Sequence, residues 1–396
     1  EIRMPGEPAI DADGTVVALS DSGTFVLPIR AQRGYRSVIQ PASGSLIYGN
    51  WDSLMHYSDH DRRSTLLGRP DAAIRALLQE KDTLWVGTDL GISILAAGSI
   101  RSLHVMDDNS PQSNIHFFSR GLTGELLIGT CSGLLRYCVS TDTLIPYPGL
   151  EAVCARACLK YGDRLFIGTY ADGAFMVDGD TVRPLPMDRL ELLKHVHAFH
   201  VDKRGSLWMS TNQGLVRASL RDINAHLADP TIGVMYSYFR ERAGLENSEF
   251  NGGCTPAMTE LRDGRVAFPS LEGSVVFAPM QVPDTLTDTS ILFENTYVDG
   301  RKWSVDDRMI FNSNTREIVF EFSIPYWEDD ANLQLEYYVE GFTDRWRPLD
   351  VSSGKLVLSG VPYGEHLLRV RLVNGVPLFI CDQESIWFEV RTDRKS

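Results

Sequence analysis

The sequence of 396 residues contains no run of about 18 consecutive apolar residues, so no segment of it is predicted to cross a bilayer as a helix. It begins with "EIRMPGEPAI", which lacks the basic stretch and following apolar run of a secretory signal. A targeting segment removed by processing is compatible with this start. The length allows two or three domains, and the 43% of hydrophobic residues can form substantial cores.

Positive charge and cysteine are both scarce. The 38 Lys and Arg residues stand against 52 Asp and Glu residues, and the formal net charge of −14 disfavours nucleic acid as a partner. Six cysteines are too few for a disulfide scaffold at this size, and no C-x-x-C pair occurs. We therefore expect structural or incidental roles for the cysteines, and the sequence leaves their redox state open.

Recognisable catalytic motifs are also missing. The sequence has no G-x-S-x-G, no Walker loop and no paired-carboxylate motif. His195 and His197 alternate along "HVHAFH", but no acidic or cysteine partner stands at a zinc-binding spacing from them. We therefore expect no catalytic residue, no metal and no cofactor in this chain.

One pattern is present seven times. It is an apolar segment followed by a polar turn that contains glycine, as in "LWVGTDLG" over residues 84–91. The copies begin at Val16, Leu46, Leu84, Leu126, Leu165, Leu207 and Val266. Their starts are on average about 42 residues apart, which is the period of a four-stranded propeller blade.

A short apolar segment and a glycine turn precede the copies, so the repeating unit is strand, turn, strand, turn, strand. One unit cannot bury both of its faces, whereas a ring of units can, and ring closure protects the sheet edges. The sequence therefore predicts an all-β fold with a seven-bladed β-propeller over residues 1–282, in which residues 1–5 complete the last blade. An open array or a six-bladed ring is the alternative. The longest interval contains an insertion, predicted to be a helix over residues 219–227 with Ser219 as its N-cap.

The pattern changes after residue 282. A linker over residues 283–290 leads into residues 291–392, where alternating stretches such as "EIVFEFSI" and "HLLRVRLV" are separated by turn residues. About 100 residues of this kind predict an immunoglobulin-like β-sandwich. Residues 393–396 form a short polar tail.

Both parts resemble one family. The two-component regulator propeller repeat, D-x-x-G-x-L-W-I-G-T-x-x-G-L, is matched by Asp202, Gly205, Leu207, Trp208, Thr211, Gly214 and Leu215. "AGLENSEFNGG" (residues 243–253) resembles the element that opens the last blade in these proteins, and "LEYYVEGFTDRW" (residues 335–346) resembles the core of the Y-Y-Y domain. Leu19 and Ser210 depart from the Gly of the G-T pair.

The resemblance implies the periplasmic sensor region of a hybrid two-component histidine kinase that detects oligosaccharides and controls polysaccharide-utilisation genes. It implies that this region is not an enzyme and that the kinase, receiver and DNA-binding parts and a membrane helix lie outside this chain. It further implies a homodimer through the sandwich and a juxtamembrane role for residues 393–396. Family members usually carry two propellers before the sandwich, whereas this chain has one.

The residues immediately before the predicted inner strands form a mostly basic column. They are Gly6, Arg36, Arg75, His116, Arg156, His197 and Pro256. In a propeller these positions converge at the mouth of the central channel, where like charges require acids or an anion for compensation. We expect an acidic sugar there, because arginine matches the geometry of carboxylate and sulfate. The alternative is that arginine is common at this strand position and pairs with neighbouring carboxylates.

Aromatic and amide groups on the same rim suit a sugar ligand. Trp51 and Tyr170 can stack on a pyranose face. The candidates for binding sugar hydroxyls are Asn114, Asp172, Asn212, Gln213 and Asn251. Trp85 and Trp208 lie within second strands, where we expect them to serve blade packing.

Two other classes of function stay open. One is a propeller enzyme acting on acidic glycans, either sialidase-like or a lyase with His116 or His197 as its base. The D-x-x-G spacing of the repeat disfavours a sialidase, whose box is D-x-G. The other class is a protein-docking scaffold.

Overall fold

The computed structural model describes residues 7–10, 16–20, 23–26, 36–42, 45–49, 51–58, 60–105, 114–138, 141, 143–252, 255–283, 289–304, 309–326, 329–351, 353–374 and 379–392. They divide into two compact units. The first comprises Glu1–Pro230 and Phe239–Gln281, and the second comprises Thr231–Tyr238 and Val282–Ser396. The strand predicted for residues 1–5, Gly6 and the tail 393–396 lie outside the described residues.

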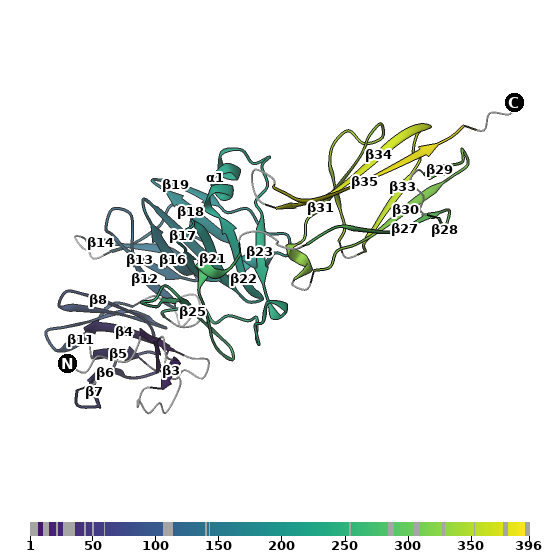
Figure 1. The fold of residues 1–396 in the computed structure, drawn as a ribbon. Coiled ribbons are helices and arrows are strands. Elements are labelled where there is room, and N and C mark those ends of the chain that lie inside the picture. The colour runs from purple at the N-terminus through teal and green to yellow at the C-terminus, as the bar shows by residue number, and fades with distance from the viewer. Residues whose placement is uncertain are drawn as a thin grey trace. The chain divides into compact units, whose positions relative to one another are not determined.

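The first unit contains seven antiparallel sheets within its described residues, in the chain order of the seven repeats, which confirms the predicted propeller (Figure 1). Blade one contains β1 (Glu7–Ile10), β2 (Val16–Ser20) and β3 (Gly23–Val26). Blade two contains β4 (Ser37–Ala42), β5 (Ser45–Gly49), β6 (Leu54–Ser58) and β7 (Arg63–Gly68). Blade three contains β8 (Ile74–Glu80), β9 (Thr83–Thr88), β10 (Gly91–Ala96) and β11 (Ser99–Val105). Blade four contains β12 (Phe117–Arg120), β13 (Leu126–Thr130), β14 (Gly133–Cys138) and β15 (Thr143–Pro146). Blade five contains β16 (Ala155–Tyr161), β17 (Arg164–Thr169), β18 (Ala174–Asp178) and β19 (Thr181–Pro184). Blades six and seven contain β20 (Val196–Val201), β21 (Ser206–Thr211), β22 (Gly214–Ser219); β24 (Thr259–Glu260), β25 (Val266–Ser270), β26 (Gly273–Phe277).

A buried threonine closes the turn after the second strand of blades three to six. The Thr88 hydroxyl donates to the carbonyl oxygen of Gly91 at 3.0 Å and accepts from the backbone N–H of Leu90 at 3.2 Å. The same two bonds are made by Thr130, Thr169 and Thr211. The glycine that ends the turn has positive φ, 137° at Gly91 and 136° at Gly214. The G-T-x-x-G motif is therefore a device that fixes the backbone of one turn.

The glycine before this threonine permits close packing of consecutive blades. A Cβ on Gly87 would lie 2.5 Å from Cγ2 of Ile115, which precedes β12 in the next blade. A Cβ on Gly168 would lie 2.8 Å from the carbonyl oxygen of Val196 on β20. The second strand of one blade thus contacts the start of the next inner strand at a distance that only glycine allows.

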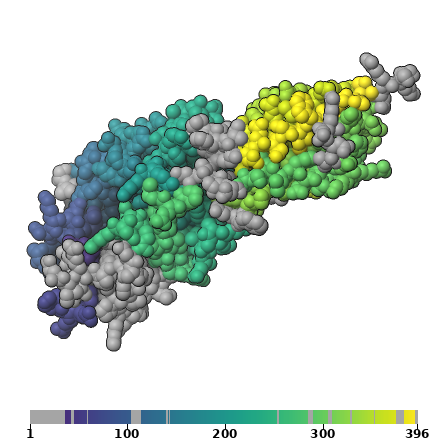
Figure 2. All heavy atoms as spheres, viewed as in Figure 1, coloured from purple at the N-terminus to yellow at the C-terminus, as the bar shows by residue number. Residues whose placement is uncertain are grey.

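The hydrophobic cores of the first unit lie between blades. One cluster joins Leu77 and Val86 of blade three to Ile47 of blade two. Another packs Trp85 of blade three against Tyr137 of blade four, with ring centroids 5.4 Å apart. In the space-filling view the described residues of the first unit form a closely packed surface on the visible face (Figure 2). A single blade would expose these faces, so each blade depends on its neighbours.

The predicted helix is present as α1 (Leu220–Ala228), and the Ser219 hydroxyl accepts from the backbone N–H of Arg221, which confirms the N-cap. The insertion continues with β23 (Tyr236–Phe239) and the short helix η3 (Glu241–Ala243). Two further 3-10 turns are η2 (Leu192–Lys194) and η4 (Pro279–Gln281).

The second unit is the predicted sandwich. One sheet has the order β28 (Arg301–Trp303), β27 (Leu292–Val298), β30 (Glu317–Ser323), β33 (Lys355–Ser359). The other has the order β29 (Met309–Phe311), β35 (Phe379–Val390), β34 (Gly364–Asn374), β31 (Leu335–Val339), β32 (Arg347–Leu349), and η5 (Asp330–Asn332) precedes β31.

The sandwich core is aromatic. Phe320 and Phe388 are buried, with ring centroids 5.6 Å apart. Arg371 on β34 binds two residues of the segment that resembles the Y-Y-Y core: its guanidinium lies 3.8 Å from the ring centroid of Trp346 and donates to Glu336 at 2.6 Å. These contacts give that motif a structural role.

The substitution Gly168→Ala should lower the free energy of unfolding of the propeller by about 1–3 kcal/mol, because the added methyl group would press on the backbone carbonyl of Val196. Gly233→Ala is the matched control, since a Cβ there has no atom within 4 Å, and it should change the free energy by less than about 0.5 kcal/mol. Denaturant unfolding followed by tryptophan fluorescence measures both. Equal effects of the two substitutions would contradict the role assigned to the glycine.

Candidate functional site

The starts of the inner strands and the threonine-closed turns lie at the same end of the blades. The backbone N–H of Asp89, in the turn after β9, donates to the carbonyl of Ala73, just before β8, at 3.0 Å. In blade five the N–H of Tyr170 donates to the carbonyl of Cys154 at 2.9 Å. The predicted shared rim is therefore present, and we call this end of the propeller the mouth.

Side chains at the mouth form one pair in each of blades two to six. The first member immediately precedes the inner strand in blades two and four, as predicted, whereas in blades three, five and six the prediction is wrong and it is the second residue of that strand. The second member follows the turn threonine or its equivalent. The pairs are Arg36 with Trp51, Arg75 with Asp89, His116 with Cys131, Arg156 with Tyr170, and His197 with Asn212. The same pair of positions thus carries four kinds of contact: an ion pair, two arginine–aromatic contacts, a histidine–sulfur contact and a histidine–amide contact.

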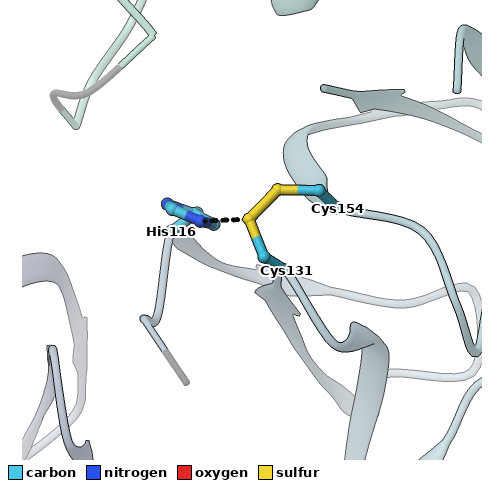
Figure 3. Close-up of side chains that lie close together, drawn as sticks. All are labelled: His116, Cys131 and Cys154. Atoms are coloured by element: carbon cyan, nitrogen blue, oxygen red, sulfur yellow. Dashed lines mark hydrogen bonds between the residues drawn. A yellow bond between two sulfur atoms is a disulfide. The ribbon is translucent and has the colours of Figure 1, made fainter. Parts of the chain in front are cut away.

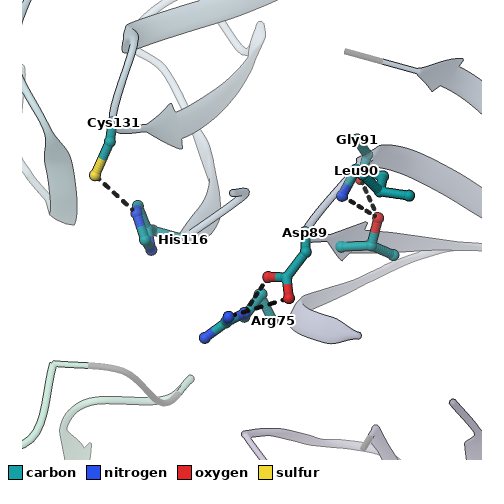
Figure 4. Close-up of polar contacts among 7 residues, drawn as sticks. Arg75, Asp89, Leu90, Gly91, His116 and Cys131 are labelled. Atoms are coloured by element: carbon teal, nitrogen blue, oxygen red, sulfur yellow. Dashed lines mark hydrogen bonds and ion pairs between the residues drawn. The ribbon is translucent and has the colours of Figure 1, made fainter. Parts of the chain in front are cut away.

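Arg75 is held by a carboxylate. Its Nε donates to Oδ1 of Asp89, and its Nη2 donates to Oδ2 at 3.1 Å (Figure 4). Only 17% of the Arg75 side chain and 27% of the Asp89 side chain are exposed. The alternative interpretation, an arginine paired with a neighbouring carboxylate, is thus correct for this blade.

The arginines of blades two and five stack on aromatic rings instead. The guanidinium carbon of Arg36 lies 4.9 Å from the ring centroid of Trp51, and that of Arg156 lies 4.9 Å from the ring centroid of Tyr170. Trp51 and Tyr170 are each 41% exposed, so part of each ring faces solvent.

The two histidines of the column have neutral partners. Nε2 of His197 lies 2.5 Å from Oδ1 of Asn212. Nε2 of His116 lies 3.2 Å from Sγ of Cys131, which is bonded to Sγ of Cys154 in a disulfide (Figure 3). Cys131 belongs to blade four and Cys154 precedes the inner strand of blade five, so the disulfide links two blades at the mouth.

Bulges set the direction of three column residues. The pairing of inner and second strands shifts register between Ile74 and Ala76, and the corresponding shifts in blades five and six occur at Arg156 and His197. A bulge inserts one residue and redirects its side chain, which is common beside functional sites. The basic residue in each of these blades is the inserted one.

Burial and neighbouring positive charges both affect the column residues. Burial lowers the pKa of His116 to about 3, and the charges of Arg156 and Arg75 contribute. Burial also lowers the pKa of the Arg156 guanidinium, and the charge of Arg75 lowers it further. His116 is therefore neutral at pH 7, while Arg156 is a cation in a partly desolvated, like-charged environment.

A segment of blade seven lies across the mouth. The N–H of Thr255 donates to the carbonyl of Arg36 at 2.8 Å, and the Thr255 hydroxyl donates to the carbonyl of His116 at 3.2 Å. A Cβ on Gly252 would lie 2.0 Å from Nδ1 of His197. Because Arg36, His116 and His197 stand at the inner strands of blades two, four and six, the segment reaches between separated blades. We call residues 251–252 and 255–256 the mouth strap.

Unused hydrogen-bonding capacity is concentrated near the mouth. Within the described residues, five buried side-chain atoms have no hydrogen-bond partner, and four of them belong to residues at or next to the start of an inner strand: Oγ of Ser37, Nε of Arg156, Nδ1 of His195 and Nδ1 of His197. The fifth is Nε of Arg136 on β14. Buried polar groups of this kind are rare in folded proteins. Arg156, unlike Arg75, therefore keeps a donor that no carboxylate of the described chain satisfies.

The remaining candidates lie at the same end of the blades with less defined contacts. Asp172 and Gln213 are exposed, and their backbone N–H groups bind the turn threonines. Asn114 is half-buried just before Ile115, and Asn251 starts the mouth strap, where its N–H donates to the carbonyl of Pro269. Trp85 and Trp208 are buried within their strands, which confirms their packing role.

Sequence reasoning missed Asp89, Cys131 and Thr255. The repeat alignment carried the signal for the first two, because Asp89 and Cys131 occupy the same position after the turn threonine as Tyr170 and Asn212. No repeat signal marks Thr255, since the mouth strap has no counterpart in the other blades.

Comparison with known proteins gives no matching family model. The protein "Histidine kinase P4" of Formosa agariphila is 21% identical over 216 residues, which are 52% of this chain and 15% of that protein. The extracellular domain of the hybrid two-component system BT3049 from B. thetaiotaomicron is similar in structure, with a TM-score of 0.68 and 16% identity, over 98% of this chain and 55% of that one. This chain therefore spans about half of that domain and a small part of the kinase.

These similarities confirm the resemblance to two-component sensor proteins, and at this level of identity the structural likeness establishes the fold. Among the described helices, none is long and apolar enough to span a membrane.

The pH dependence of stability should report on His197. Burial lowers its pKa to about 4, the Asn212 side chain opposes the shift, and Arg156 and His195 add to it. Because the folded pKa lies below the ordinary value near 6.5, the unfolded chain takes up the proton first. Stability should therefore fall as the pH drops from 6.5 towards 4, by about 2 kcal/mol at pH 5.

His197→Gln should remove this part of the decline. The measurement is the difference in unfolding free energy between pH 7 and pH 5 for the wild type and the variant, so that any loss of packing at pH 7 cancels. His60→Gln is the control, because the His60 side chain is 92% exposed. The same pH difference in the wild type and in His197→Gln would contradict the analysis.

Proposed function

We propose that this chain is the ligand-sensing region of an extracytoplasmic sensor, and that its ligand is an acidic oligosaccharide bound at the mouth of the propeller. The observation that carries the proposal is the contrast between Arg75 and Arg156. Arg75 is already neutralised by Asp89, whereas Arg156 has a buried Nε without an acceptor and lies beside a half-exposed tyrosine.

A sugar carboxylate or sulfate at the half-buried Arg156 would bring a negative charge to a guanidinium that, unlike that of Arg75, forms no ion pair among the described residues. It would accept from the guanidinium, and its negative charge would stabilise an arginine whose pKa is lowered mainly by burial and, to a smaller extent, by the charge of Arg75. The exposed parts of Tyr170 and Trp51 offer apolar surfaces to pyranose rings next to their arginines. Asn212, Gln213 and Asp172 follow the turns at the same rim and are proposed to bind hydroxyl groups.

The proposed cellular role rests on fold and chemistry together. The two similar proteins are a histidine kinase and the extracellular domain of a hybrid two-component system. A disulfide between Cys131 and Cys154 suits an oxidising compartment. We therefore propose that the chain lies on the periplasmic side of a membrane-anchored kinase that controls gene expression. In this proposal the sandwich transmits the signal and forms the contact between the two subunits of a dimer.

A glycan enzyme and a docking scaffold are separated from a sensor by one experiment. The protein is incubated with uronic-acid oligosaccharides, and both binding and product formation are followed. Saturable binding without turnover supports the sensor. Turnover would assign an enzyme, and absence of both would favour a scaffold.

Arg156→Gln should weaken binding of a uronic-acid oligosaccharide by about 10- to 100-fold, since a hydrogen bond to a charged group contributes about 1.5–3 kcal/mol. Its affinity for the methyl-esterified oligosaccharide should change less than about threefold, because the ester carries no charge to lose. Isothermal titration calorimetry measures both.

Arg164→Gln is the matched control. Arg164 begins β17, at the end of the strand opposite to Tyr170, and forms a surface ion pair with Asp178 at 3.0 Å. It should bind both oligosaccharides as the wild type does. An equal loss in Arg156→Gln for the acid and its ester would exclude a carboxylate contact.

Signal transfer requires that the ligand favours one arrangement of the two units over another. Distances between spin labels on the sandwiches of a dimer should therefore shift when the oligosaccharide is added. Unchanged distance distributions at saturating ligand would count against the relay.

A further inference from the structure

Blade four differs from the other blades in the chemistry of its rim pair. Its neutral imidazole faces sulfur, whereas the other pairs join a basic group to a carboxylate, an aromatic ring or an amide. Nε2 of His116 lies 3.2 Å from Sγ of Cys131, and Cys131 is joined to Cys154 (Figure 3). The donor atoms of all three residues lie within 4.8 Å of one another. Three residues of the metal-ligand type thus meet at one point of the mouth.

We propose that His116, Cys131 and Cys154 form a binding site for a thiophilic metal cation, for which Zn²⁺ is the probe, when the disulfide is reduced. Two thiolates and one imidazole favour Zn²⁺ or Cu⁺ over Mg²⁺ and Ca²⁺, which prefer oxygen ligands. With Zn–S near 2.3 Å and Zn–N near 2.0 Å, the ligand atoms of a tetrahedral site lie roughly 3.5–3.8 Å apart. The distance of 3.2 Å between Nε2 of His116 and Sγ of Cys131 is close to this range.

The redox step balances with a dithiol as the reductant. The dithiol transfers two electrons and two protons to the Cys131–Cys154 bond and leaves as its own disulfide, while the two cysteines become thiols. Binding of a divalent cation then releases both thiol protons to solvent. Two thiolates and one divalent cation carry no net charge, so the complex adds no charge to a rim that already contains Arg75 and Arg156.

The backbone around the three residues is already fixed. The N–H of His116 donates to the carbonyl of Gly129 at 2.7 Å, and the carbonyl of His116 accepts from Thr255. Cys131 follows the turn threonine Thr130, and the carbonyl of Cys154 accepts from the N–H of Tyr170. Metal binding therefore requires side-chain rotation around a held backbone, which is the condition for a site of defined geometry.

The site would have an open fourth position, because the described residues supply three ligands. Such a position is taken by water or by a group of a ligand in the mouth. Cys158 does not compete for the cation, because burial raises the pKa of its thiol to about 11 and keeps it protonated.

In the test, the whole chain is first reduced with a phosphine. The phosphine is then removed under argon. The phosphine takes up the oxygen of one water molecule and becomes the phosphine oxide, and the disulfide becomes two thiols. Zn²⁺ is then titrated in competition with a chromophoric chelator, and Cd²⁺ is added separately to record thiolate-to-metal absorption. Reduced protein should bind one equivalent, and the oxidised protein should bind none. Bound Zn²⁺ should protect Cys131 and Cys154 from alkylation, as mapped by peptide mass spectrometry.

Variants identify the ligands. Cys131→Ser and Cys154→Ser should each weaken Zn²⁺ binding by more than about tenfold, and His116→Gln by about tenfold. Cys138→Ser, at the end of β14, is the matched cysteine control and should bind as the reduced wild type does. Circular dichroism and thermal unfolding of each reduced variant establish that it is folded.

Three results would overturn the proposal. The first is that the reduced wild type binds Zn²⁺ no more tightly than Cys131→Ser does. The second is that the oxidised protein binds Zn²⁺ as tightly as the reduced protein. The third is that Zn²⁺ protects cysteines other than Cys131 and Cys154 from alkylation. Because no oligosaccharide is present in the assay, its outcome is independent of the proposed sugar-binding function.

Discussion

In blades three to six the site depends on a pair of hydrogen bonds made by one buried hydroxyl in the turn after the second strand. Thr88, Thr130, Thr169 and Thr211 all bind a carbonyl and an N–H of their own turn, and this closes the turn in one conformation. The residue that follows is then held opposite the start of the inner strand. A protein that repeats this turn presents a set of side chains at one rim, while evolution is free to vary their chemistry.

The propeller uses this freedom to compensate most of the positive charge it places at the mouth. Asp89 neutralises Arg75, burial keeps His116 and His197 uncharged at neutral pH, and aromatic faces receive the other two arginines. Most of the basic groups at the rim therefore have partners or are uncharged, and only a few are left to recognise an anion. The mouth strap adds hydrogen bonds from Thr255 to Arg36 and His116 at the same end of the blades.

The fold could be predicted from the sequence because its determinants repeat. The period near 42 residues, the G-T pair and the turn glycines each reflect a local requirement that recurs in each blade. Ser219 as a helix cap was predictable for the same reason, since the cap bond is local. The basic column could be placed at one rim because strand direction alternates within a blade.

The partners of the column were less predictable. Arg75 pairs with a carboxylate, whereas Arg156 does not, because the residue after the turn threonine is Asp89 in one blade and Tyr170 in the other. This difference can be predicted only when those two positions are aligned. The disulfide was beyond the sequence, because Cys131 and Cys154 meet across two blades. The mouth strap was beyond it as well, since the hydrogen bonds of Thr255 join residues more than a hundred positions apart.

The central claim is that recognition takes place where the inner strands begin. A crystal structure of the chain with a bound acidic oligosaccharide addresses it most directly. The account predicts a sugar at the mouth, with its acidic group on the Arg156 guanidinium and a ring against Tyr170. A sugar bound on the sandwich, or on the outer strands of the blades, would contradict it.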